Sequence, residues 1–134
     1  MFRSLFKKKH PPAVDARAVG KYPALTKSGG GFFYDDVLEY RVWVHPERGG
    51  ENLQLDQDYF FAFATYSEAL NFSEKTRGAE TPLVLVRQLE YINEPEPGVF
   101  EHQIGERITE WQPEWLQGNK RLAKSIGNFL GKNA

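Results

Sequence analysis

The stretch Tyr59-Phe60-Phe61-Ala62-Phe63-Ala64, with Thr65-Tyr66-Ser67-Glu68 directly after it, decides the fold of this chain. The first run is rich in aromatic residues that favour strands, and it shows no helical period. In the second run, a threonine followed three residues later by a glutamate is typical of a helix start. A β-branched, apolar run then opens at Leu83 and predicts a second buried strand. Residues 58–92 are therefore predicted to form a strand-helix-strand unit.

The residues from Val37 to Val44 alternate between apolar and polar side chains. This alternation predicts a half-buried strand with one face toward the core and the other toward solvent. Because a glycine-containing loop joins this strand to the aromatic run, the two are expected to form a hairpin. The apolar face would carry Leu38, Tyr40, Val42 and Val44, and the polar face Glu39, Arg41 and Trp43.

The last third of the chain predicts one more strand and helical segments. An acidic turn containing prolines and a glycine follows Ile92 and leads into a strand from Val99 to Trp111. Pro113 suits the first turn of a helix that would run through Arg121, and the segment 122–130 is amphipathic. This region therefore predicts a second hairpin followed by one or two helices.

These elements together predict an α+β fold, with a four-stranded, mostly antiparallel sheet in ββαββα order and helices on one face. Residues 1–36, which glycines and prolines interrupt, are predicted to form a basic N-terminal arm, and residues 37–134 a single domain. One core is expected to contain Val42, Phe61, Phe63, Leu70, Leu83 and Leu85.

Composition limits the class of protein. The 134 residues are 40% hydrophobic, which suits one folded domain, and there is no cysteine for disulfides, thiol nucleophiles or thiolate metal sites. No apolar run approaches the roughly 20 residues that span a bilayer, and no signal-peptide pattern opens the chain. We therefore expect a cytoplasmic protein without a transmembrane segment.

Charge is distributed unevenly along the chain. Residues 28–118 carry six Lys and Arg against seventeen acids, whereas both ends are basic. An acidic body predicts no nucleic-acid binding through the main surface. In residues 1–10, Phe2, Leu5 and Phe6 precede three lysines, which allows weak contact with a membrane surface. The favoured interpretation is a frayed tail, or a strap packed on this core or on a partner subunit.

Candidate chemical groups are few. His45 and His102, with one carboxylate, would suit a metal site, but neither histidine lies in a recognised ligand spacing. The acid pairs at Asp35-Asp36 and Asp56-Gln57-Asp58 adjoin turns, where Asp bonds its own backbone. The usual nucleophile, zinc and dinucleotide motifs are absent. We therefore expect no metal, no cofactor and no catalytic residues, and favour a protein that is not an enzyme.

A glycine triplet gives one further candidate. Lys27-Ser28 stands before Gly29-Gly30-Gly31, and glycine backbones can turn several N–H groups toward a phosphate. In a phosphate-binding loop, however, the lysine follows the glycines and opens a helix. A hinge is therefore the favoured interpretation.

The remaining signals favour an interaction surface. Trp43 lies on the polar face of its strand, as an interface residue would, and apolar faces at both ends of the chain need cover. We therefore expect a non-catalytic protein-interaction or self-associating module, as a homo-oligomer or with a protein partner. A twofold dimer is the commonest outcome. The candidate interface residues are Trp43, Phe2, Phe6, Ile126 and Phe129.

Four segments together carry a family resemblance: Arg17 to Leu25, Glu39 to Pro46, Phe61 to Leu70 and Glu110 to Leu116. They resemble a small bacterial family of uncharacterised proteins, some of which are labelled as members of the N-acetyltransferase (GNAT) superfamily. The resemblance implies an acetyltransferase-like or other small-molecule enzyme as the alternative function. That superfamily holds the acetyl-CoA pyrophosphate on a glycine-containing turn before a helix, whereas this chain has no glycine from Ala64 to Glu68. We therefore expect no binding of acetyl-CoA.

Overall fold

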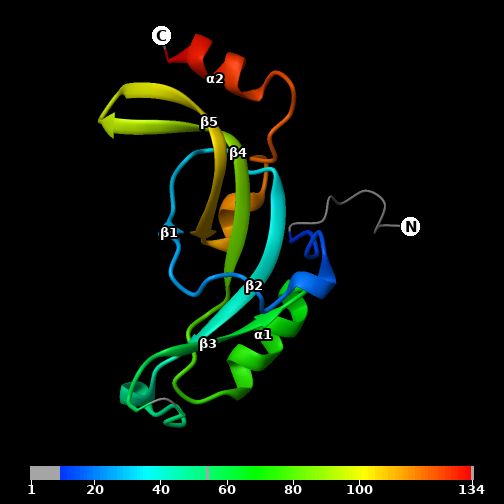
Figure 1. Ribbon diagram of the computed structural model, residues 1–134, viewed down its shortest axis with the longest axis vertical. Helices are drawn as coiled ribbons and strands as arrows, with labels where there is room; N and C mark the ends of the chain where they lie inside the picture. The colour runs from blue at the N-terminus through cyan, green and yellow to red at the C-terminus, as the bar shows by residue number, and fades with distance from the viewer. Residues whose placement is uncertain (1–9, 54, 134) are drawn as a thin grey trace.

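A computed structural model describes residues 10–53 and 55–133 and confirms the α+β class. Figure 1 shows a curled sheet with one helix against its lower part and a second beside the far end of a long hairpin. The strands are β1 (Lys27–Ser28), β2 (Asp36–Val44), β3 (Tyr59–Phe63), β4 (Leu83–Glu96) and β5 (Val99–Trp111). The helices are α1 (Tyr66–Lys75) and α2 (Ser125–Lys132), with 3-10 turns η2 (Ala16–Ala18), η3 (Pro46–Arg48) and η4 (Pro113–Leu116).

The sheet is mixed and five-stranded, in the order β1-β5-β4-β2-β3. Strand β2 pairs antiparallel with both β3 and β4, and β4 and β5 form the second hairpin, as expected. The prediction of four strands was wrong in detail, because β1 adds a short strand parallel to β5. Two residues without a period give no strand signal. Lys27 and Ser28 become a strand only because the fold places them beside Thr109 and Glu110 of β5.

The predicted strand-helix-strand unit is present. The Thr65 hydroxyl accepts a hydrogen bond from the Glu68 backbone N–H at 3.3 Å and donates one to the Glu68 carboxylate at 2.8 Å, so α1 begins as expected. Gly78 follows the helix with a φ of 79°, and a Cβ at this position would lie 2.4 Å from the Gly50 nitrogen. The close approach of these two backbone segments therefore requires a glycine.

One face of the sheet carries the main apolar core. The core cluster comprises Tyr34, Val37, Tyr40, Val42, Ala69, Val84, Val86, Trp111 and Leu116. Of the six residues predicted for this core, Val42 belongs to the cluster and Phe63 packs against it. Leu85 is buried but pairs with Glu39 on the opposite face.

The other three predicted core residues are less buried than expected. Leu70 and Leu83 are half-buried, and 43% of Phe61 is exposed. The prediction for Phe61 was wrong because β3 is the outermost strand of the sheet, so no further strand covers it. Aromatic composition indicates a strand, but it does not indicate whether that strand is central or at an edge.

The opposite face of the sheet is buried as well, which corrects the expectation of a solvent-facing side of β2. The side chains of Glu39 and Arg41 have no exposed surface. The N-terminal arm covers them: the Gly20 N–H donates to Glu39, and the carbonyls of Pro23 and Ala24 accept from Arg41. In Figure 1 this blue segment crosses the sheet and continues up its outer edge as β1.

The C-terminal segment contains one helix and one 3-10 turn. The helix expected from Pro113 to Arg121 is confined to η4, and Gly118 follows with a φ of 80°. Helix α2 packs on the distal half of the β4–β5 hairpin, where the Phe129 ring lies 4.7 Å from that of Phe32 and 5.1 Å from that of Phe100. No described helix is long and apolar enough to cross a membrane.

Candidate functional site

Arg41 is a fully buried charged residue of β2. Its Nε donates to Glu39 Oε2 at 2.7 Å, and its two Nη atoms donate to the Ala24 and Pro23 carbonyls at 3.1 and 2.6 Å. The guanidinium also lies 4.3 Å from the centre of the Phe60 ring. All three guanidinium nitrogens therefore have partners in this chain and the side chain has no exposed surface, so Arg41 is a structural residue that offers no surface to a ligand.

Trp43, a predicted interface residue, takes part in the same network. Its indole N–H donates to Glu110 Oε2 at 3.0 Å, and its ring lies 4.9 Å from that of Phe60. Glu110 in turn lies 3.5 Å from Arg41 Nη1. The structure therefore places Trp43 half-buried and hydrogen-bonded within its own subunit.

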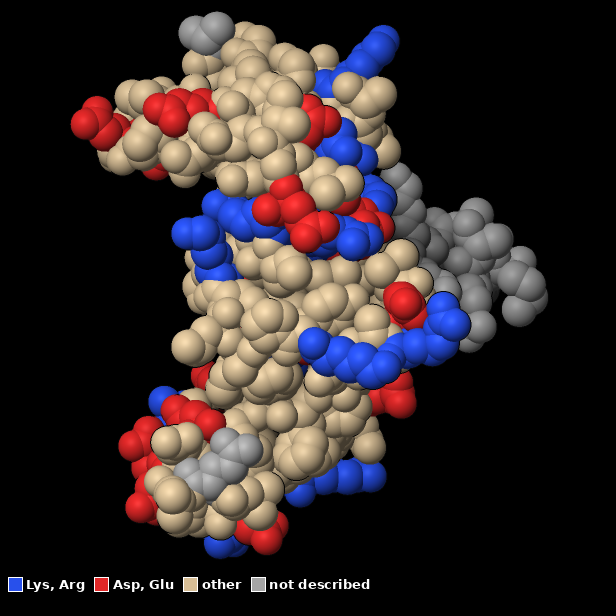
Figure 2. All heavy atoms as spheres, viewed as in Figure 1, with Lys and Arg blue, Asp and Glu red and all other residues tan. Residues whose placement is uncertain are grey.

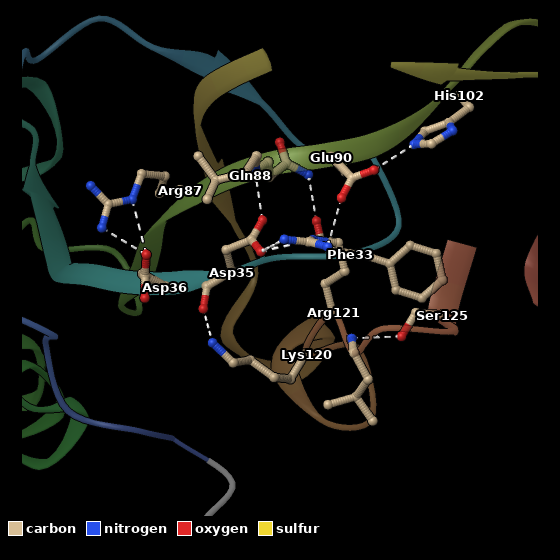
Figure 3. Close-up of polar contacts among 12 residues, drawn as sticks. Phe33, Asp35, Asp36, Arg87, Gln88, Glu90, His102, Lys120, Arg121 and Ser125 are labelled. Carbon is tan, nitrogen blue, oxygen red and sulfur yellow. Dashed lines mark hydrogen bonds and ion pairs between the residues drawn. The ribbon is translucent and has the colours of Figure 1, made fainter. Parts of the chain in front are cut away.

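A second polar network fastens the C-terminal segment to the sheet (Figure 3). Arg121 lies 2.6 Å from Asp35 Oδ1 and 2.8 Å from Glu90 Oε2, and Lys120 donates to the Asp35 carbonyl. The hydrogen bond to Asp35 raises the pKa of Arg121. The other Asp35 oxygen accepts from the Leu89 N–H at 2.6 Å. The acid pair predicted as a local turn therefore joins segments far apart in sequence.

The same view places His102, one of the two histidines weighed as metal ligands. Its Nε2 lies 3.0 Å from Glu90 Oε1, at the outer end of this network (Figure 3). His45 lies at the end of β2 and is no part of that network. The structure therefore does not bring the two histidines together with one carboxylate.

The glycine triplet forms a packed turn. Gly31 has a φ of 89°, and a Cβ there would lie 2.1 Å from Gln88 Nε2. The Gly30 carbonyl accepts hydrogen bonds from Gln88 and from the Trp111 indole. The turn therefore directs the Gly30 carbonyl toward the sheet. A phosphate site would instead need several N–H groups directed at the anion.

The other predicted interface residues lie at the two ends of the chain. Ile126 is buried within its own subunit, and Phe129 packs on Phe32, Phe33 and Phe100. Phe2 and Phe6 lie outside the described residues. In the C-terminal segment, Ile126 and Phe129 are therefore covered by the same chain, whereas Leu122 is 67% exposed.

An aromatic pocket of about 350 Å³ lies near η4 and the glycine turn. Its lining residues are Gly30, Phe32, Trp111, Trp115 and Asn119. None of these side chains titrates or acts as a nucleophile, so the pocket offers apolar contact and no acid-base chemistry.

A wider groove lies between β3 and α1. It measures about 500 Å³ and receives the exposed ring of Phe61. The ring of Phe72, from α1, lies 5.1 Å from that of Phe61 and forms the opposite wall. The full lining is Gly49, Glu51, Leu53, Tyr59, Phe61, Phe72, Lys75, Thr76 and Arg77. This groove adjoins an open sheet edge, which neither of the polar networks does.

A histidine cluster, which we define as His45 with the acids Glu47, Asp58 and Glu80, lies at the same end of the molecule as this groove. His45 Nε2 lies 2.8 Å from Glu80 Oε2, and Nδ1 lies 2.8 Å from Asp58 Oδ1. The bond to Glu80 raises the pKa of His45 above 6.5, burial partly opposes this rise, and Asp58 adds to it. Glu47 brings a third ligand atom close to those of His45 and Asp58. The residue order singled out His45 as a possible ligand and Asp58 as a turn residue, but it gave no signal for Glu80, and Glu47 was overlooked although it follows His45 by two residues.

Comparison with known proteins adds no relative. No protein-family model matches the chain, and neither a curated protein nor a solved structure matches it. The resemblance to a bacterial family with acetyltransferase-labelled members therefore stays a prediction, and function must be argued from the surfaces described above.

Proposed function

We propose that this chain is a non-catalytic, self-associating module, and that two copies pair through the open edge of β3. The observation that carries the proposal is an uncharged, aromatic strand at the end of the sheet, Tyr59–Phe63, beside the groove that Phe61 and Phe72 line. Unpaired N–H and C=O groups on such an edge are a template for another strand.

Self-pairing is favoured over an unrelated partner because the strand is compatible with its own copy. A twofold axis through Phe61 would set β3 antiparallel to itself, so that each residue of one copy faces a residue of the other. No charged residue lies between Tyr59 and Phe63, so no like charges would meet across the pair. The two Phe61 rings would then bury the apolar surface that 43% exposure leaves open in one subunit.

The alternative, an acetyltransferase-like or other small-molecule enzyme, has less support. In α1 the Glu68 N–H is bonded to the Thr65 hydroxyl, and the Glu68 carboxylate lies at the same helix end. A negative side chain at this position opposes a pyrophosphate at the helix start. The aromatic pocket near η4 lacks acid-base groups, and the groove beside β3 holds no histidine.

Sedimentation velocity at micromolar concentrations, with Phe61→Lys as the variant, tests the proposal. We expect the unaltered chain to form a dimer and Phe61→Lys to remain monomeric, because two lysines would face each other across the strand pair. Leu122→Lys is the matched control. Leu122 is 67% exposed and lies between η4 and α2, outside the sheet, so this variant should dimerise normally.

Hydrogen exchange gives a second readout. The β3 amides should exchange more slowly in the dimer than in Phe61→Lys, while the β4 amides stay unchanged. A chain that is strictly monomeric at these concentrations would contradict the proposal, as would a dimer that Phe61→Lys leaves intact. A melting curve for each variant confirms that it is folded.

A further inference from the structure

We propose that His45, Glu47 and Asp58 form a binding site for a first-row divalent metal ion. One ligand atom from each residue lies within 4.8 Å of the others. The three residues come from the end of β2, the turn η3 and the residue before β3, so the loop between these strands brings them together. This inference stands independently of the proposed self-association.

The orientation of the imidazole is the first argument. In the neutral tautomer with its proton on Nε2, the His45 imidazole donates to Glu80 Oε2 at 2.8 Å, because a carboxylate accepts hydrogen bonds. The lone pair of Nδ1 then faces Asp58 Oδ1, a second acceptor, at 2.8 Å. Among the described residues this buried nitrogen lies at ion-pair distance from Asp58 but has no hydrogen-bond partner. A cation between two such acceptors would satisfy both.

The contact with Glu80 is the second argument. Histidines that bind a metal through one ring nitrogen usually donate the other N–H to a carboxylate, which fixes the tautomer and the ring plane. Glu80 has this position relative to His45. The backbone holds the arrangement, because the His45 N–H donates to the Gly78 carbonyl and the Glu80 N–H to the Trp43 carbonyl.

Ligand type and charge indicate the class of ion. An imidazole with two carboxylates suits zinc, manganese and their neighbours, whereas Mg²⁺ prefers oxygen ligands alone. Three protein ligands leave further positions for water. Figure 2 shows several Asp and Glu residues, in red, among blue Lys and Arg at the lower end of the molecule, where this loop lies in Figure 1. The nearby cation Arg48 lies 3.9 Å from Glu80, outside the ligand set.

Glu47 separates this site from a rival explanation in which a protonated His45 simply bridges Asp58 and Glu80. Glu47 is exposed, and it makes no hydrogen bond or ion pair with the described part of the chain. A protonated imidazole would bond to Asp58 and Glu80 without Glu47, whereas a metal ion would use Glu47 as a third ligand. Replacing Glu47 should therefore leave the metal-free protein unchanged and weaken only the metal complex.

Calorimetric titration of the chelator-treated full chain with Zn²⁺, then with Mn²⁺ and Mg²⁺, tests the site. We expect one Zn²⁺ per chain, weaker Mn²⁺ binding and the weakest binding for Mg²⁺. Glu47→Gln should lower the Zn²⁺ affinity by at least about tenfold at an unchanged metal-free melting temperature, and Glu80→Gln by about 10- to 100-fold without removing a ligand. Glu51→Gln, an exposed carboxylate on the same loop, is the matched control and should bind as the unaltered chain does.

Three results would overturn the inference. They are an unaltered chain that binds no Zn²⁺, a Glu47→Gln variant with full affinity, and a Glu51→Gln variant weakened as much as Glu47→Gln. The second would favour the bridging proton, and the third a diffuse attraction of cations to an acidic loop.

Discussion

The two faces of the sheet are both buried, but by different means. On one face Tyr40 and Val42 of β2 pack with Val84 of β4 beneath α1 and η4. On the other, Glu39 and Arg41 lie under the N-terminal arm. An apolar face gains stability from any well-packed cover, whereas a buried charge needs a partner for each donor and acceptor. The arm provides those partners through its backbone groups.

Breaking the buried ion pair should have the largest effect on stability. Glu39→Ala removes the nearest carboxylate of the Arg41 cation and leaves only Glu110 at 3.5 Å, and the side chains of Glu39 and Arg41 have no exposed surface. Removing one partner of a buried pair costs about 3–5 kcal/mol. Urea unfolding monitored by circular dichroism measures the loss.

The control for this prediction replaces both partners. Glu39→Leu with Arg41→Met should recover only part of the lost stability, because it removes the unpaired charge. It still leaves the Gly20 N–H and the Pro23 and Ala24 carbonyls without their hydrogen-bond partners. If Glu39→Ala unfolds at the same urea concentration as the unaltered chain, the polar face is not buried as described, and the contrast between the two faces fails.

Replacing Leu85 tests whether apolar side chains are also closely packed on the sheet face that carries Glu39 and Arg41. Its side chain has no exposed surface and pairs across the sheet with Glu39. Leu85→Ala should cost about 2–5 kcal/mol through lost burial and the cavity that remains. Thermal melts would measure this loss beside Leu122→Ala, an exposed leucine whose replacement should change stability by less than about 0.5 kcal/mol. Equal, small losses in both variants would contradict the burial of Leu85.

Replacing Tyr40, on the apolar face, should give the smallest loss of stability, and this loss should depend on pH. Its hydroxyl donates to the Pro11 carbonyl at 2.6 Å, so Tyr40→Phe should cost about 0.5–1.5 kcal/mol at pH 8. Burial raises the pKa of Tyr40 above its ordinary value of 10.0. The stability associated with the neutral phenol is therefore full below about pH 10 and is lost as the pH rises further, because the unfolded chain ionises first.

Tyr40→Phe has no such group to ionise. Its disadvantage in unfolding free energy should therefore shrink above pH 10 and then reverse, as measured by urea unfolding at a series of pH values. A constant difference between the two proteins from pH 8 to pH 11 would show that Tyr40 is not shielded from solvent.

Local patterns in the sequence determined several elements by themselves. The aromatic run gave β3, the Thr65 cap gave the start of α1, and the β-branched run at Leu83 gave β4. The turn after Ile92 predicted the β4–β5 hairpin. Strand propensity, capping and turn chemistry act between residues a few positions apart, so the order of residues is enough to indicate them.

Tertiary structure decided the rest. Strand β1 exists only because β5 lies beside it, Phe61 is exposed because β3 is at an edge, and Glu39 is buried because the arm crosses it. The histidine cluster likewise joins His45 to Glu80, 35 positions away. Each of these features depends on which distant segments meet. That outcome is set by the packing of the whole chain, and the periodicity of one segment contains no information about the segment that will cover it.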